Sequence, residues 1–182
     1  MNTMNTWEED AFEYGDQTGS VAVAQPAIFH QTLYTGSGID VLSILLQMYQ
    51  RPNPQVAIGP VDASCPLILC DLTQPDSPII YASDAFATLT GYSGYEVLGR
   101  NCRFLQAPPG ARTMPRQSSA DKAAVRQMRH AVSHNQECQV EITNYRKDGS
   151  KFLNYLTIIP VRWNSNEFNY SVGLQSMASE LP

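Results

Sequence analysis

The chain has 182 residues, which suits one domain with an extension and allows a sizeable hydrophobic core. Its net charge of −5 comes from the N-terminus, because residues 1–30 hold five acidic residues and no Lys or Arg. The remaining residues are neutral overall, which argues against non-specific nucleic-acid binding, since that activity needs a basic face.

The sequence also argues against a membrane-spanning protein and against a secreted one. No apolar run approaches the ~20 residues of a membrane span, and the N-terminus lacks the basic-then-apolar order of a signal peptide. The four cysteines, at positions 65, 70, 102 and 138, form no CxxC pair and no zinc spacing, which fits a reducing compartment. We therefore expect a soluble, intracellular protein without a membrane partner. A chain of 20.2 kDa could reach both the cytoplasm and the nucleus.

Residues 1–29 and 30–60 form two zones before the main domain. The acidic residues 1–29 are expected to be a disordered leader, with an interaction tail as the alternative. Residues 30–60 are expected to form a cap, in which Asp40 begins a helix. The apolar spacing i, i+3, i+4, i+7 predicts its buried face, made by Leu42, Leu45, Leu46 and Tyr49. The two prolines of residues 51–54 end this helix.

Residues 61–178 are expected to form the globular domain, followed by a short tail, 179–182. A short helix is predicted between Ser83 and Gly91, and Ser93 with Glu96 predicts a capping box on the next one. A longer helix is predicted over 121–134, after a Pro/Gly/Ser loop at 108–119. The predicted strands are 66–71, 79–82, 137–146, 151–160 and 167–177, with a turn at Asp148-Gly149.

The last three strands each place one carboxamide in an apolar row. Because side chains alternate along a strand, Asn144 shares a face with Ile142, Asn154 with Leu156, and Gln175 with Gly173. Each amide alone is compatible with an ordinary surface position. Three such amides together favour a flat ligand with a polar edge.

The opposite faces of the last two strands are apolar as well. A solvated antiparallel sheet alternates apolar and polar residues, so this second face must be covered. The helix at 39–49 is one candidate for the cover, and a dimer interface is the other.

Residues 99–106, with the sequence GRNCRFLQ, are the most informative stretch. Cys102 lies between the amide of Asn101 and the guanidinium of Arg103, and Gln106 supplies a second amide four residues later. A flavin has a wide apolar ring, a uracil-like edge that needs amide partners, and an anionic phosphate tail. The stretch offers a group for each, and a thiol that could attack the ring.

This stretch resembles the signature of LOV (light-oxygen-voltage) photoreceptor domains, a flavin-binding branch of the PAS fold. Further matching segments follow in the same order at 76–83, 89–92, 144–149 and 152–154. Residues 30–71 are similar to the Vivid-type small photoreceptors of filamentous fungi. The resemblance implies an α+β PAS/LOV fold, with a five-stranded antiparallel sheet, flanking helices and an N-terminal cap helix on the outer sheet face.

The resemblance also assigns roles to the site residues. Cys102 would form a photo-adduct with the flavin, Asn101 and Gln106 would hold the flavin from the helical side, and Asn144 and Asn154 would bind its pyrimidine edge. Leu156 joins this cofactor-binding set. Gln175 would face ring atoms N5 and O4 and turn its amide after adduct formation, because a carboxamide has one donor end and one acceptor end.

Arginines are the expected phosphate ligands, since a guanidinium binds two phosphate oxygens at once. By resemblance these are Arg103 and Arg129; a solvated position on the helix is the alternative for Arg129. The long loop 107–120 implies FAD, with Arg112 and Arg116 near the second phosphate. FMN is the alternative cofactor, and the loop would then be a surface insertion.

Cys65, at the junction of cap and domain, is expected to relay the state of Gln175 to the cap; a buried core cysteine is the alternative. The resulting hypothesis is a blue-light receptor, not an enzyme, that forms a light-favoured homodimer. The resemblance implies photoadaptation of transcription through a White Collar-type LOV transcription factor.

Three other functions remain open from the residues. A flavin-binding, redox-sensing PAS domain would not need the Cys102 thiol. A cysteine-dependent enzyme would need a fixed base, and the three histidines, His30, His130 and His134, stand in no catalytic context. His130 and His134 have the i, i+4 spacing of a metal pair but lack a third ligand. A purely structural interaction module would leave the three amides unexplained.

Overall fold

The computed structural model describes residues 39–113 and 115–181. The expected leader, residues 1–29, and the start of the expected cap, residues 30–38, lie outside the described residues. Within the described ranges, no helix has the length and apolar character needed to cross a lipid bilayer.

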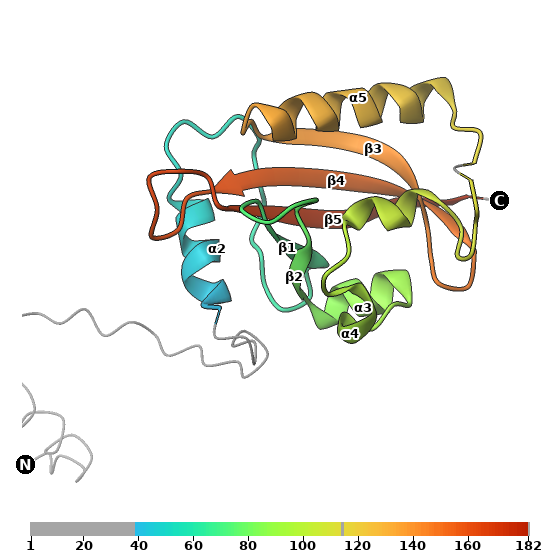
Figure 1. Cartoon of the computed structure of the whole chain (residues 1–182), viewed down its shortest axis with the longest axis horizontal. Coiled ribbons are helices and arrows are strands. Elements are labelled where there is room, and N and C mark those ends of the chain that lie inside the picture. Colours follow the sequence, from blue (N-terminus) through green and yellow to red (C-terminus); the bar gives the residue numbers. More distant parts are fainter. Residues whose placement is uncertain (1–38, 114, 182) are drawn as a thin grey trace, which may run out of the picture.

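One antiparallel sheet with the strand order β2-β1-β5-β4-β3 forms the centre of the domain (Figure 1). Its strands are β1 (Leu67–Asp71), β2 (Ile79–Ala82), β3 (Cys138–Tyr145), β4 (Lys151–Val161) and β5 (Tyr170–Leu181). The five-stranded antiparallel sheet expected from the sequence is confirmed. Strand β5 lies in the middle of the sheet and pairs with β1 on one side and with β4 on the other.

The helices begin and end at the residues that local chemistry favours. They are α2 (Val41–Tyr49), α3 (Asp84–Thr90), α4 (Gly94–Val97), the 3-10 helix η2 (Cys102–Gln106) and α5 (Ser119–Ser133). Ser83 Oγ accepts from Phe86 N at 3.1 Å at the start of α3, and Gly91 ends that helix at φ 76°. The capping box of Ser93 and Glu96 is present at α4.

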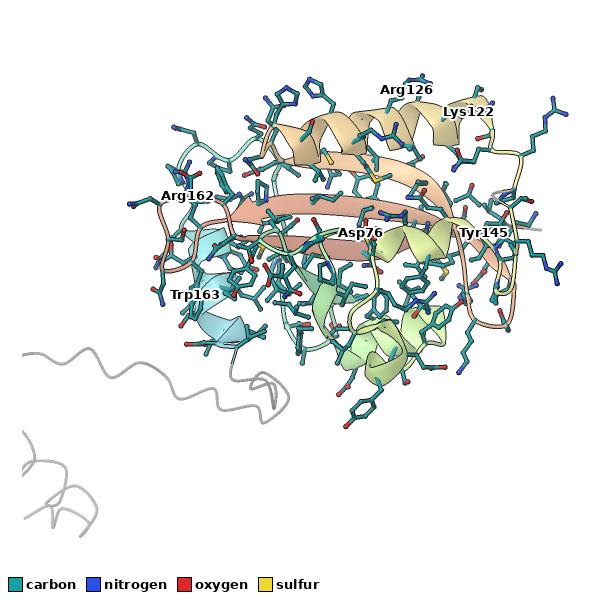
Figure 2. The ribbon with its side chains drawn as sticks, viewed as in Figure 1. Asp76, Lys122, Arg126, Tyr145, Arg162 and Trp163 are labelled. Carbon is teal, nitrogen blue, oxygen red and sulfur yellow. The ribbon has the colours of Figure 1, made fainter. Side chains whose placement is uncertain are left out.

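Helices cover the inner face of the sheet, while α2 packs on the outer face. Figure 1 shows α5 running along β3, with α3 and α4 gathered near β1 and β2 and α2 set apart from them. Lys122 and Arg126 point from α5 into solvent (Figure 2). Strand β1 is apolar on both faces because Leu67 and Leu69 pack under α2, whereas Ile68 and Cys70 face the inner side.

The buried face of α2 differs from the predicted one. Val41, Ile44 and Met48 are buried against the sheet, whereas Leu46 and Tyr49 are 47% and 44% exposed. The helix is apolar almost all round, so two faces satisfy helical spacing, and contact with the sheet decides between them. The predicted cap at Asp40 and the stop before residues 51–54 are confirmed. The helix covers the outer face as expected, and an apolar surface remains on its other side.

Strand β5 begins and ends later than predicted. Residues 167–169 belong to the turn after β4, where the Asn169 side chain bonds both backbone groups of Trp163. At the other end, Ser179 and Glu180 pair with β4, so residues 179–181 belong to the sheet and not to a tail. Glu180 also binds Arg146 at 2.8 Å, which explains how a polar segment is held in the sheet.

Asp121 fastens the start of α5 to the edge strand β3. Its carboxylate accepts from Thr143 N at 2.8 Å and from Ser118 Oγ at 2.7 Å. Burial raises the pKa of this carboxyl, but these hydrogen bonds outweigh burial and hold the pKa below its usual value. The charged form is therefore the one that stabilises the fold.

We expect Asp121→Ala to lower the free energy of unfolding by about 1–3 kcal/mol, because the Thr143 N–H loses its acceptor. A depressed folded-state pKa stabilises above the unfolded value of about 3.9 and stops doing so as pH falls through the folded value. The difference between wild type and variant should thus be full at neutral pH and shrink in acid. Urea unfolding at neutral and at acid pH measures this difference, with the exposed-site variant Glu141→Gln as the control. A difference that does not change with pH would contradict a stabilising role for the charged Asp121 carboxylate.

Candidate functional site

A cavity of about 270 Å³ lies between the inner face of the sheet, η2 and α5. This volume is near the lower end of the ~300–1,000 Å³ typical of small-molecule sites. Its walls are mostly apolar, with side chains such as Ile68, Met128 and Ile158. Polar side chains from η2, β3, β4 and β5 enter it at several points.

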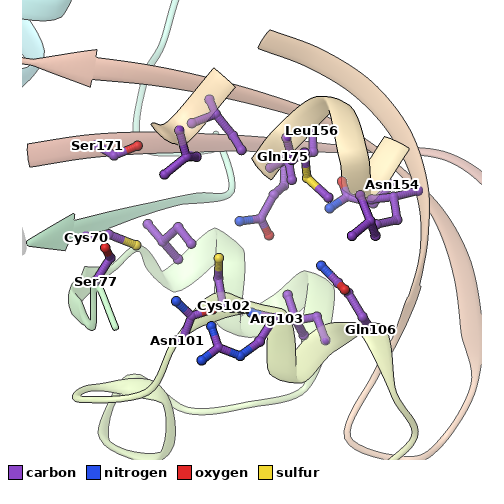
Figure 3. Close-up of a pocket in the computed structure, with 18 of the residues that line it drawn as sticks. Cys70, Ser77, Asn101, Cys102, Arg103, Gln106, Asn154, Leu156, Ser171 and Gln175 are labelled. Atoms are coloured by element: carbon purple, nitrogen blue, oxygen red, sulfur yellow. Dashed lines mark hydrogen bonds between the residues drawn. The ribbon is translucent and has the colours of Figure 1, made fainter. Parts of the chain in front are cut away.

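The 3-10 helix η2 presents Cys102 to the cavity. Asn101 caps η2, since its Oδ1 accepts from Arg103 N at 3.0 Å, and its amide nitrogen donates to the carbonyl of Asp76. The cap fixes the first residue of η2, so the Cys102 sulfur points into the cavity (Figure 3). Gln106, at the other end of η2, also lines the cavity.

A second thiol, which the sequence analysis did not single out, shares the cavity with Cys102. Cys70 of β1 is buried, and it lines the same cavity as Cys102 (Figure 3). The interaction with the Cys70 thiol lowers the pKa of Cys102, with help from Arg103, although burial opposes it. The same interaction and burial raise the pKa of Cys70. Cys102 is thus the thiol with more thiolate character.

Three carboxamides converge on the cavity from three strands. Asn144, Asn154 and Gln175 are each no more than 4% exposed, and all three line the cavity, as strand alternation predicted. Asn154 Nδ2 donates to Asn144 Oδ1 at 2.8 Å. Asn154 Oδ1 and Gln175 Oε1, however, are buried and have no hydrogen-bond partner among the described residues. Because buried polar atoms are rarely left unpaired, these two oxygens indicate a ligand with hydrogen-bond donors.

The floor of the cavity is kept open by a glycine. A Cβ atom on Gly173 would lie 3.0 Å from Ile68 Cγ1 and 4.0 Å from Leu156 Cδ1. Any side chain there would occupy the space between these two apolar residues. A wide apolar site with unpaired amide oxygens at its edge fits a flavin ring, so the donor set and the shape agree with the expected cofactor.

The predicted phosphate-binding arginines divide into two groups. Arg103 and Arg129 line the cavity, and Arg103 also forms an ion pair with Asp76. Arg112 and Arg116 do not line it; both are exposed on the loop between η2 and α5. Within that loop, Gly110 has a φ of 74°. The pairing of Asp76 with Arg103 was not predicted from the sequence.

Cys65 lies on the opposite side of the sheet from Cys102, close to Gln175. It is half-buried against the core under α2, and burial raises the pKa of its thiol. A second hollow, on the outer face, is lined by both Cys65 and Gln175. Gln175 therefore borders the inner cavity and the outer hollow, while its backbone N–H donates to Pro66 O at 2.8 Å.

The two described histidines lie away from the cavity. His130 and His134 stack on one another on α5 with ring centroids 4.2 Å apart, and neither lines the cavity wall. Among the described residues, no group of three His, Cys, Asp or Glu side chains is placed to hold a metal ion.

Comparison with known proteins gives consistent matches. The family model "PAS domain" matches residues 65–175. Blue light receptor lreA of Aspergillus flavus is 42% identical over 154 residues, covering 84% of this chain and 18% of the relative. White collar 1 protein of Neurospora crassa is 42% identical over 153 residues, covering 84% of this chain and 13% of the relative. The chain thus spans less than a fifth of these curated relatives.

A solved structure matches over most of its length. The light-state dimer of the fungal blue-light photoreceptor Vivid is 52% identical, with a TM-score of 0.71. The match covers 80% of this chain and 99% of that one.

Proposed function

The chain belongs to the PAS domain family, in its LOV branch of the Vivid type, and on that premise we propose that it is a flavin-dependent blue-light receptor. One observation carries the proposal. A thiol with a lowered pKa, Cys102, shares a largely apolar cavity with two buried amide oxygens that have no partner. The thiol supplies the sulfur for a light-driven bond, and the amides supply the recognition.

The residues of the chain would divide the work of holding the flavin. The amides of Asn144, Asn154 and Gln175 would bind the polar edge of the ring, and Gln106 would contact it from η2. Leu156 and Gly173 would keep the ring flat against the sheet. When bound, a flavin would supply blue-light absorption and an electrophilic ring carbon, and the Cys102 thiol would supply the sulfur and the proton for the light-driven reaction.

We propose that Gln175 is the first residue whose side chain changes orientation after the photoreaction. Among the described residues, none donates a hydrogen bond to its Oε1. The bound flavin would therefore determine whether the oxygen or the nitrogen of the amide faces it. A mismatched buried pair costs about 1–3 kcal/mol, which is enough to favour a turn of the amide. Because Gln175 also borders the outer hollow beside Cys65, the turn would be transmitted to the cap.

FAD is the proposed cofactor, with FMN as the alternative. Arg103 and Arg129, at the cavity wall, would bind the first phosphate, where the planar guanidinium suits two oxygens. The loop between η2 and α5 would contact the adenosine half, with Arg112 and Arg116 within that loop. Chromatography of the flavin released by denaturation distinguishes FAD from FMN directly.

Light-favoured self-association is the proposed output, through the solvent-facing side of α2. That side carries Leu46 and Tyr49, both more than 40% exposed, on the element that covers the sheet. The proposed further partner is a White Collar-type LOV transcription factor, whose light response the protein would damp in the cytoplasm and nucleus. A sensor of this kind would not act as an enzyme.

We expect Leu46→Arg to keep the protein monomeric under blue light. A buried aromatic or aliphatic anchor typically contributes about 2 kcal/mol or more to an interface, equal to a roughly thirty-fold weaker association. Light scattering after size-exclusion chromatography of illuminated samples measures this. Leu98→Arg is the matched control, because Leu98 is 44% exposed after α4. A lit Leu46→Arg protein that dimerises as wild type does would place the interface elsewhere.

The absorption spectrum of dark-purified protein before and after a blue pulse tests the proposed function. Reversible bleaching of a flavin band is the expected result. A flavin band that never bleaches would favour the redox-sensing PAS domain instead. A colourless protein that also fails to take up added flavin would contradict the proposal and leave an interaction module.

A further inference from the structure

A largely buried ion pair joins the cap to the domain, away from the residues that line the inner cavity. Arg51 Nε donates to Glu137 Oε1 at 2.5 Å, and the side chains are 12% and 10% exposed. Every other ion pair among the described residues has at least one side chain more than a third exposed. Pairs of that exposed kind contribute little, whereas a buried charge strictly needs its partner.

The chain turn at residues 51–56, here called the cap turn, is built around this carboxylate. Glu137 Oε2 accepts from Gln55 N at 3.0 Å and from Val56 N at 2.8 Å. Arg51 donates to Met48 O, in the last turn of α2, and to Val56 O, both at 2.7 Å. The charge of Glu137 is thus met by the guanidinium and by two backbone N–H groups at once.

The pair occupies a junction of three elements. Arg51 follows the end of α2, and Glu137 lies between α5 and β3. Both α5 and β3 line the inner cavity, through side chains such as Met128 and Ile142. The cap therefore has two separate attachments: the apolar contact of α2 with the sheet, and this polar contact with the α5–β3 connection.

We propose that the Arg51–Glu137 pair is the latch that holds the cap on the domain, and that opening it frees α2 and the cap turn without light. An amide at position 137 has the shape of the carboxylate but not its charge. Its NH₂ group would face donors, either the backbone N–H groups of the cap turn or the guanidinium of Arg51. The cap turn would then lose its anchor while the sheet keeps all of its own contacts. The latch requires no photochemistry, so its test does not depend on the proposed function.

Hydrogen–deuterium exchange of the full chain in the dark, followed by mass spectrometry, tests the latch. For Glu137→Gln we expect backbone amides of residues 41–56 to exchange at least ~10-fold faster than in wild type, by local opening. Amides of β4 and β5 should exchange as in wild type. Arg51→Gln should give the same pattern from the other side of the pair.

Arg162→Gln is the matched control, because Arg162 lies by the β4–β5 turn and borders the same hollow as Arg51 and Glu137 (Figure 2). The Cζ atom of Arg162 lies 4.1 Å from the ring centroid of Phe168. Arg162 takes part in none of the ion pairs among the described residues. Unchanged exchange of residues 41–56 in Glu137→Gln would overturn the proposal. Faster exchange spread over β4 and β5 would overturn it too, because Glu137 would then support the domain and not the cap. Should Glu137→Gln fail to fold, Arg51→Lys, which keeps the charge without the fork, decides by the same two criteria.

Discussion

We expect the Cys102→Ala protein to bind flavin as wild type does and to lose reversible blue-light bleaching completely. Recognition rests on the amides of three strands and on apolar walls, none of which changes in this variant. The sulfur that would react is gone, and no other thiol has the same character. Burial raises the pKa of Cys65 and sets that of Cys138 at about 11, and the pKa of Cys70 is raised as well. The visible spectrum before and after a blue pulse gives the result.

Cys70→Ala is the control for this variant, because Cys70 borders the same cavity and its thiol interacts with that of Cys102. It should still bleach, with a changed dark recovery, since the pKa of Cys102 loses its main lowering influence. Reversible bleaching that persists in Cys102→Ala would refute the assignment of the nucleophile. Loss of bleaching in Cys70→Ala alone would transfer that role to β1.

We expect Gln175→Leu to separate light detection from its output. The variant keeps the approximate shape of the side chain and the apolar cavity, so bleaching should remain. It has no amide to turn, so illumination should no longer change association. For a wild-type light response of tenfold, this is a loss of about 1.4 kcal/mol of coupling between the two sites. Sedimentation of dark and illuminated samples at equal concentration measures the difference.

Gln139→Leu is the matched control for Gln175→Leu. Gln139 borders only the outer hollow, where its Nε2 donates to Thr157 Oγ1 at 2.8 Å, and it does not reach the inner cavity. It should retain the light response. Cys65→Ala should weaken the response if Cys65 is the next member of the relay. A Gln175→Leu protein that still dimerises on illumination would show that the signal leaves the cavity by another route.

Elements determined by local chemistry could be predicted from the sequence. The Ser83 and Asp40 caps, the Gly91 stop and the Asp148-Gly149 turn depend on neighbours a few residues away. The buried face of α2 depends instead on the sheet against which it packs, and an all-apolar helix does not disclose that choice. The late end of β5 has a similar cause, because Glu180 is held by Arg146, 34 residues earlier.

The site could be predicted from the sequence where the alternation of side chains along a strand determines which face of the sheet a residue occupies. Parity placed Asn144, Asn154 and Gln175 on one side, and the cavity contains all three. The same parity holds for Cys70, two residues after Ile68, so the signal for the second thiol was present in the sequence. Contacts between distant loops left no such signal. The pairing of Asp76 with Arg103 and that of Arg51 with Glu137 both join segments remote in sequence.

The central position of β5 has a consequence for biosynthesis. Ser171, Gly173 and Gln175 form part of the cavity wall, yet they belong to β5, which is synthesised after the four other strands of this sheet. Until β5 inserts between β1 and β4, neither the sheet nor the cavity is complete, so a nascent chain has no finished pocket to load. Such long-range closure is slow compared with helix formation and leaves apolar strand edges exposed in the meantime. Cofactor supply once β5 has emerged should therefore govern the yield of folded protein.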